Sequence, residues 1–252
     1  MSSVTFTVGS AKLDTDTLIF DLPAGWTCPG AQACLAKAAR DSGQITDGHK
    51  GPDGFRCFAA SLEFYPNVRD MRWRNFEALK AAGTTPRMAR ELTDGLVTTW
   101  GKRGPRGSVR IHASGDFFNQ RYFDAWMHVA RQFPHVIFYA YTKSLTYWLA
   151  RAHMMPANFR LTASEGGKHD ALITAHDLPR ARVIFSEDEA GGEPIDHDDS
   201  HARQADHDFS LLIHGNQPKG SRALSALRAL KARGWTGYSR NKKNKEAAHG
   251  NA

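Results

Sequence analysis

The chain has 252 residues, of which 41% are hydrophobic and 23% charged, and this composition excludes a chain that is disordered throughout. It contains no run of about 18 apolar residues, which a membrane span needs. The start of the chain lacks the basic residues and apolar core of a secretory signal. We therefore expect a soluble, cytoplasmic protein with no membrane partner.

The first hundred residues combine strands, a long loop and two helices. Strand-like runs occupy residues 5–8 and 17–22. They precede residues 23–54, which are rich in glycine and proline and are predicted to be mainly loop. Apolar residues at helical spacing then predict helices over about 68–82 and 86–100.

The rest of the chain alternates short apolar runs with amphipathic stretches. This alternation is typical of βαβ units and a parallel sheet. With the strand near 18–22 it gives about six units. The predicted strands are residues 108–112, 135–141, 158–162, 181–185 and 210–213.

Polar clusters follow nearly every predicted strand. In a parallel barrel all the carboxyl ends of the strands meet at one mouth, whereas an open doubly wound sheet uses only those at its switch point. We therefore favour a partial (β/α)6-type barrel over an open sheet. The prediction is a single α/β domain over residues 1–238, with a long cysteine-containing loop after the first barrel strand.

All three cysteines lie in the first quarter of the chain, at Cys28, Cys34 and Cys57. Three thiolates can bind three irons of a [4Fe–4S] cluster and leave the fourth iron open to another ligand. They can equally bind zinc, with His49 as a fourth ligand. The alternative without a metal is three buried, apolar cysteines.

The strand ends supply further candidate cofactor-binding residues. In Ser114-Gly115-Asp116, the glycine permits close approach of a ligand and the carboxylate can accept hydrogen bonds from an amine or hydroxyl. The alternative is that Asp116 caps the next helix. The other side chains expected to point into the same opening are those of Lys143, Ser164, Glu165, Ser186, Glu187 and His214.

Two charged segments have competing interpretations. Residues 193–208 contain three histidines and five aspartates, and we favour a flexible hydrophilic insertion over a divalent metal site. The net charge is +7, and much of the excess lies near the C-terminus. Residues 239–252 are predicted to be a basic, disordered tail, which is either solvated or in contact with nucleic acid.

Several segments, taken in order, resemble the gene product 88 family of phage- and plasmid-borne proteins. They include CPGAQAC, RIHASGDF, VIFYAYTKS and HDFSLLIHGNQPKG, and the resemblance covers about residues 4–238. In that family the cysteines lie closer together, so residues 35–56 look like an insertion before Cys57.

The arrangement also resembles the radical S-adenosylmethionine enzymes, which are partial (β/α)6 barrels. The resemblance implies that Cys28, Cys34 and Cys57 bind [4Fe–4S], and that Ser114-Gly115-Asp116 is the turn that binds the methionine amino group of S-adenosylmethionine. The usual C-x3-C-x2-C spacing is absent, so these roles are transferred by position in the fold.

Three functions follow as hypotheses. The first is a radical S-adenosylmethionine-type enzyme that needs a reductant and acts on an unidentified substrate, for which the basic charge suggests a nucleotide or nucleic acid. The second is a zinc-stabilised hydrolase acting on nucleic acid, which would use Asp116, Glu165, Glu187 or the segment 193–208. The third is a basic DNA-binding accessory protein whose cysteine site is purely structural.

Overall fold

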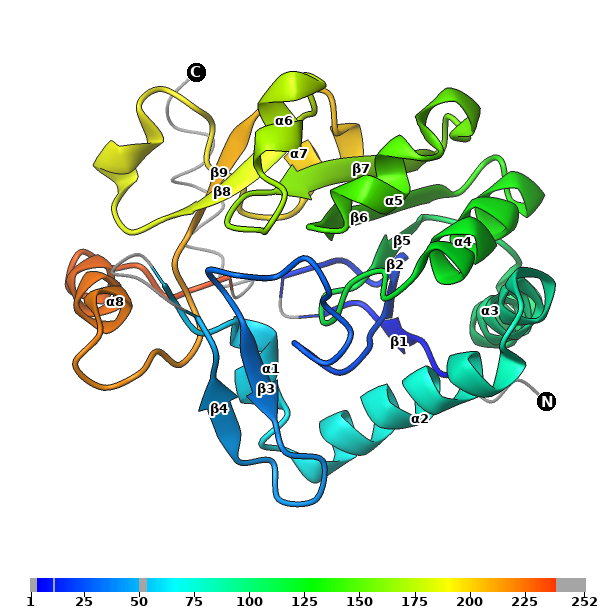
Figure 1. Cartoon of the computed structure of the whole chain (residues 1–252), viewed down its shortest axis with the longest axis horizontal. Coiled ribbons are helices and arrows are strands. Elements are labelled where there is room, and N and C mark those ends of the chain that lie inside the picture. The colour runs from blue at the N-terminus through cyan, green and yellow to red at the C-terminus, as the bar shows by residue number, and fades with distance from the viewer. Residues whose placement is uncertain (1–3, 11, 50–53, 239–252) are drawn as a thin grey trace.

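The computed structural model describes residues 4–10, 12–49 and 54–238, and it is built around a seven-stranded sheet (Figure 1). The strand order is β1-β2-β5-β6-β7-β8-β9, and all neighbours are parallel except the edge strand β1, which is antiparallel to β2. The predicted α/β class with a mainly parallel sheet is therefore confirmed. The strands are β1 (Thr7–Val8), β2 (Thr17–Phe20), β5 (Ser108–Ile111), β6 (Ile137–Thr142), β7 (Phe159–Ser164), β8 (Arg180–Ile184) and β9 (Phe209–Leu212).

Helices connect successive strands, and their ends follow ordinary capping chemistry. The Asn119 side chain accepts a hydrogen bond from the Tyr122 N–H at the start of α4, and Ser221 does the same for Leu224 in α8. None of the helices in the described ranges is long and apolar enough to cross a membrane. The helices are α1 (Phe58–Leu62), α2 (Pro66–Ala82), α3 (Thr85–Trp100), α4 (Gln120–Gln132), α5 (Leu145–Leu149), α6 (Ala171–Ala175), α7 (Ser200–Gln204) and α8 (Arg222–Ala232).

The two faces of the sheet bury different side chains. Val109 and Ile111 belong to the largest apolar cluster, which also contains residues of α3 and α4. Arg110, between them, lines a cavity on the other face, as does Ile19 of β2. This alternation follows from the two-residue period of a strand. It places the helix-packed core on one face of the sheet and the cavity on the other.

The loop after β2 contains structure that the sequence did not predict. A two-stranded antiparallel hairpin, β3 (Ala36–Ala38) and β4 (Ile45–Asp47), projects from it (Figure 1). Its strands are too short, and too close to glycines, to give a periodic signal. The prediction of a long cysteine-containing loop after the first parallel strand is confirmed, since Cys28 and Cys34 lie before the hairpin and Cys57 after it.

Part of the segment 193–208 is a buried charge network, so the interpretation as a solvated insertion is wrong for Asp196 and Asp199. Both side chains are fully buried. Asp199 accepts hydrogen bonds from Lys12 Nζ and Arg110 Nη1, which hold its carboxyl pKa below the ordinary value. An acidic run does not reveal which of its members faces a buried cation. The predicted tail 239–252 lies outside the described residues.

We expect Asp199→Asn to destabilise the protein by about 3–5 kcal/mol, because Lys12 and Arg110 would keep their charge without a carboxylate partner. The matched control is Asp198→Asn. That neighbouring side chain is exposed and accepts a hydrogen bond from the Ser200 N–H through Oδ1, which the amide oxygen of asparagine also accepts, so the loss should be within about 0.5 kcal/mol. Urea unfolding of both variants measures the difference, and equal losses would contradict the assignment.

Candidate functional site

A cavity of about 630 Å³ opens where the carboxyl ends of the parallel strands meet the loop after β2. Cys28, Cys34 and Cys57 all line it, together with Ser114, Gly115 and Asp116 from the turn after β5. Lys143, Ser164 and His214 come from the ends of three further strands. The structure therefore brings most of the predicted site residues into one space.

The three cysteines are free thiols that interact with one another. Burial raises the pKa of Cys28 well above its ordinary value, and Asp116 and the other two thiols raise it further. Burial and the nearby Cys34 raise the pKa of Cys57 to about 11. The protein alone thus keeps the Cys28 and Cys57 thiols protonated, and a bound metal cation would reverse that preference.

His49 does not join the cysteines. It is not among the residues that line the cavity, and its ring packs so closely on Gly54 that a Cβ there would lie 2.3 Å from Nδ1. Within residues 4–10, 12–49 and 54–238, no group of three or more His, Cys, Asp or Glu side chains is arranged to hold a metal ion.

The Ser114-Gly115-Asp116 turn fits tightly between the end of β2 and the cysteine loop. The Ser114 N–H donates to Asp21 Oδ1 at 2.8 Å, and the Ser114 hydroxyl donates to the Leu22 carbonyl at 2.8 Å. Gly115 has φ +88°, and a Cβ there would lie 2.6 Å from Thr27 Oγ1. Only glycine suits this position, because both the conformation and the space exclude a side chain.

The Asp116 carboxylate is occupied by protein donors. It accepts hydrogen bonds from the Phe117 N–H at 2.7 Å, the Thr142 hydroxyl at 2.6 Å and the Lys143 N–H at 2.9 Å. Burial raises its pKa. Asp116 therefore joins the turn to the end of β6. The alternative role as a helix cap is wrong, because Asn119 caps α4.

The Lys143 side chain connects the end of β6 to the end of β7. Its ammonium donates to the Ser164 carbonyl and hydroxyl, each at 2.8 Å, and to the Glu165 carbonyl. Lys143 is buried, so these oxygens replace the water that the charge would otherwise hold. The ends of β6 and β7 are thereby held together at the rim of the cavity.

Three predicted site side chains do not line the cavity, namely those of Glu165, Ser186 and Glu187. Glu165 follows Ser164 in the chain, so it points to the opposite side, where it pairs with Arg180 at 3.1 Å. Ser186 precedes a short 3-10 helix, Glu187–Ala190, in which Glu187 is exposed. Their predicted place in the opening is therefore wrong, and for Glu165 the reason is the direction of its side chain.

His214 forms part of the cavity wall between two aromatic rings. Its ring centroid lies 4.5 Å from that of Phe58 and 4.6 Å from that of Tyr238. Nδ1 lies 3.0 Å from the Leu212 carbonyl oxygen, so the proton of the neutral ring belongs on Nδ1. Burial lowers the pKa of His214 to about 4.

A second group of cavity residues was missed by the sequence analysis. Arg72 of α2 is buried, and its guanidinium donates to Glu63 Oε1 at 3.1 Å and Asp21 Oδ2 at 3.3 Å. The available signal was a polar stripe at helical spacing on α2, where Arg69, Arg72 and Asn75 are all buried. The remaining members, Lys12, Arg110, Tyr141 and Tyr238, gave no signal of their own.

We expect Gly115→Ala to cost about 3 kcal/mol or more, because the left-handed conformation and the contacts with Thr27 and Leu22 both oppose a side chain. Gly191→Ala is the matched control. Gly191 is also left-handed, at φ +60°, but its Cβ would meet nothing within 4 Å, so a loss of about 1 kcal/mol is expected. Chemical unfolding of both variants separates the cost of the left-handed conformation, which both positions share, from the cost of the steric contacts at Gly115. A loss of stability at Gly115 no larger than that at Gly191 would refute the tight fit.

Folding lowers the pKa of His214 from 6.5 to about 4. As the pH drops, His214 is therefore protonated in the unfolded chain before it is protonated in the folded protein. The contribution of neutral His214 to stability is complete above pH 6.5 and decreases towards pH 4. We therefore expect the stability of the wild type, relative to His214→Phe, to fall by about 1.4 kcal/mol per pH unit below pH 6.5. Urea unfolding at several pH values checks this, and a pH-independent difference would contradict it.

Comparison with known proteins identifies relatives in phages. The gene 88 proteins of Mycobacterium phages D29 and L5 are each 31% identical over 125 residues, which cover 48% of this chain and 45% of each phage protein. The alignment thus spans less than half the length of these relatives. No solved structure matches the chain. The family model of gene product 88 matches residues 4–234, and the chain therefore belongs to the gene product 88 family.

Proposed function

We propose that the protein is an iron–sulfur enzyme of the radical S-adenosylmethionine type, built on a partial (β/α)6 barrel. The parallel strands β2, β5, β6, β7, β8 and β9 follow one another in the sheet in chain order. A doubly wound sheet reverses its order at a switch point, whereas a barrel keeps the order of the chain. The strand order supports the barrel.

The observation that carries the proposed function is that all three cysteines of the chain line the cavity at the carboxyl ends of these strands. Chance burial of cysteine gives no reason for all three to line the same cavity. The Ser114-Gly115-Asp116 turn lies beside them, at the end of the second parallel strand.

The donor set favours a cluster over a closed structural zinc site. Such a zinc site needs four protein ligands, and His49, the fourth ligand of the expected Cys3His site, does not line the cavity. Three cysteines without a fourth protein ligand match a [4Fe–4S] cluster that leaves one iron open to another ligand.

When bound, a three-cysteine cluster and S-adenosylmethionine supply reductive formation of a 5′-deoxyadenosyl radical, which abstracts hydrogen from a substrate. The protein holds, orients and shields these groups. Cys28, Cys34 and Cys57 would hold the cluster. Gly115 lets the turn pack directly against Thr27 and Leu22 beside the cysteines. Asp116 and Lys143 are positioning residues, since their polar atoms already bond the strand ends.

The test is anaerobic purification and reconstitution, followed by assay of iron, sulfide and zinc. We expect about four irons and four sulfides per chain. Single substitutions Cys28→Ala, Cys34→Ala and Cys57→Ala should each abolish this loading. Glu187→Ala, outside the cavity, should leave it unchanged. Zinc without iron after reconstitution, or normal iron loading in the three cysteine variants, would overturn the proposal.

A second assay tests the reaction type. The loaded enzyme is mixed with S-adenosylmethionine and a strong reductant, and 5′-deoxyadenosine is measured. Its formation by the wild type, and its loss in the cysteine variants, supports a radical enzyme. A loaded cluster that yields no 5′-deoxyadenosine would instead indicate an electron-transfer or structural role.

A further inference from the structure

Four aromatic rings form a continuous row outside the cavity, which we name the aromatic row: Trp26, Trp73, Phe76 and Phe118. Successive ring centroids are 5.8, 6.0 and 5.1 Å apart. Trp26 comes from the cysteine loop and Phe118 from the segment before α4, whereas Trp73 and Phe76 belong to α2. The row therefore joins three separate parts of the chain.

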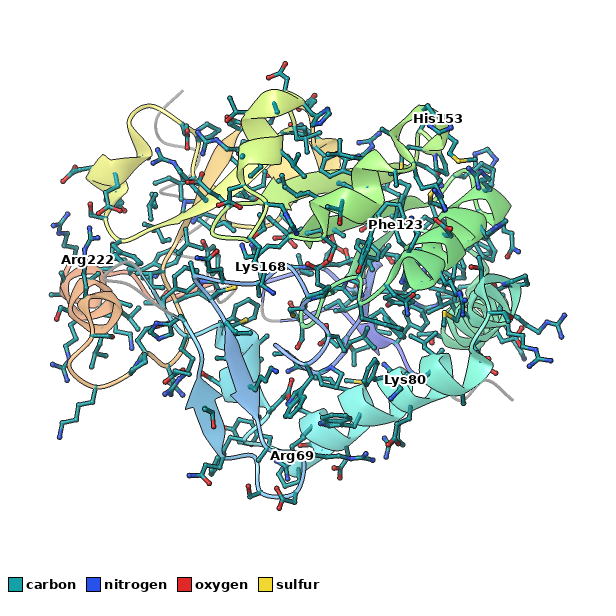
Figure 2. The ribbon with its side chains drawn as sticks, viewed as in Figure 1. Arg69, Lys80, Phe123, His153, Lys168 and Arg222 are labelled. Atoms are coloured by element: carbon teal, nitrogen blue, oxygen red, sulfur yellow. The ribbon has the colours of Figure 1, made fainter. Side chains whose placement is uncertain are left out.

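Each of the first three rings carries a cation. Lys37 Nζ lies 4.6 Å from the Trp26 ring centroid, and Lys80 Nζ lies 5.4 Å from that of Phe76. The Arg40 guanidinium lies 4.9 Å from the Trp73 ring centroid, and it also pairs with Glu77. Figure 2 labels Arg69 and Lys80 near the two ends of α2, the helix that carries Trp73 and Phe76.

Packing accounts for Phe76 and Phe118, which are partly buried against the largest apolar cluster, but it does not account for Trp26. Trp26 is 47% exposed, although tryptophan is among the most buried residues on average. Its indole N–H donates to the Ala38 carbonyl at 2.9 Å, which fixes the ring but leaves much of its area open to solvent. Phe64 and Tyr65, just before α2, are more exposed still, at 67% and 55%. Exposed aromatic area of this kind marks an interaction site.

We propose that the aromatic row, with Lys37, Arg40 and Lys80, binds single-stranded nucleic acid. Aromatic rings stack on bases of any sequence, and flanking lysine and arginine side chains pair with phosphates. A protein partner with an apolar surface would have to desolvate these three cations, whereas a polyanion pairs with them. A duplex hides its base faces within its own stack, so a single strand fits better.

The proposal does not depend on the iron–sulfur assignment, since none of these side chains lines the cavity. The two sites are nevertheless close in the chain, because Trp26 lies two residues before Cys28. A strand bound on the aromatic row would therefore lie beside the loop that forms the cavity wall.

The test uses the full chain and a fluorescein-labelled oligothymidylate of about 15 nucleotides, with binding measured by fluorescence anisotropy. We expect Trp26→Ala and Lys37→Glu each to weaken binding about tenfold. Lys231→Glu is the matched control, because it makes the same charge change at an exposed position on α8. It should change the affinity less than twofold. Equal weakening by Lys37→Glu and Lys231→Glu would mean that the affinity depends only on the net charge of the protein, and it would overturn the proposal.

Three further binding measurements separate stacking on the aromatic row from other causes of nucleic-acid binding. Trp26→Phe retains an aromatic ring that can stack on a base, so this variant should bind the oligonucleotide more tightly than Trp26→Ala. Thermal unfolding of both variants checks that any difference in affinity does not come from a difference in stability. Duplex DNA of the same length should bind more weakly than the single strand. Substitution of Lys242 and Lys243 by Gln should leave the effect of Trp26→Ala intact. Failure of the wild type to bind, equal binding of the duplex, or loss of all binding in the tail variant would overturn the proposal.

Discussion

The geometry of the cavity depends on the ion pairs of the buried Arg72 guanidinium. It pairs with Asp21, at the end of the first parallel strand, and with Glu63, after α1. Asp21 in turn accepts the Ser114 N–H, and Glu63 accepts the Ala24 N–H. A buried charge is tolerated only when its partners are in place. One cation therefore fixes the cysteine loop, α1 and the turn after β5 relative to one another.

The same principle continues along the rim. Asp116 connects the turn after β5 to the end of β6, and Lys143 connects the end of β6 to Ser164. Apolar alternation along the strands builds the body of the sheet, but these polar contacts set the shape of its opening. They also restrict the functional roles available. A carboxylate or ammonium that is already saturated with protein partners positions its neighbours, and this is the role that the contacts assign to Asp116 and Lys143.

Sequence reasoning succeeded where one local pattern determines the outcome. The second predicted helix, residues 86–100, corresponds to α3 (Thr85–Trp100), and the first strand of the alternating region, 108–112, corresponds to β5 (Ser108–Ile111). It failed where the outcome depends on a distant partner. The burial of Asp199 requires Lys12 and Arg110, and the outward direction of Glu165 depends on where β7 ends. No local pattern contains either fact.

Burial dominates the electrostatics of the cavity. It is the main cause that raises the pKa of Cys28 and lowers the pKa of His214, so both side chains are held in their neutral forms. Asp116 and the neighbouring thiols add to the effect on Cys28, whereas Arg72 opposes it at Cys57. Lys12 and Arg110 are instead paired with the buried carboxylate of Asp199. Charge pairing therefore keeps Asp199, Lys12 and Arg110 ionised, while burial keeps the Cys28 and Cys57 thiols and the His214 imidazole neutral.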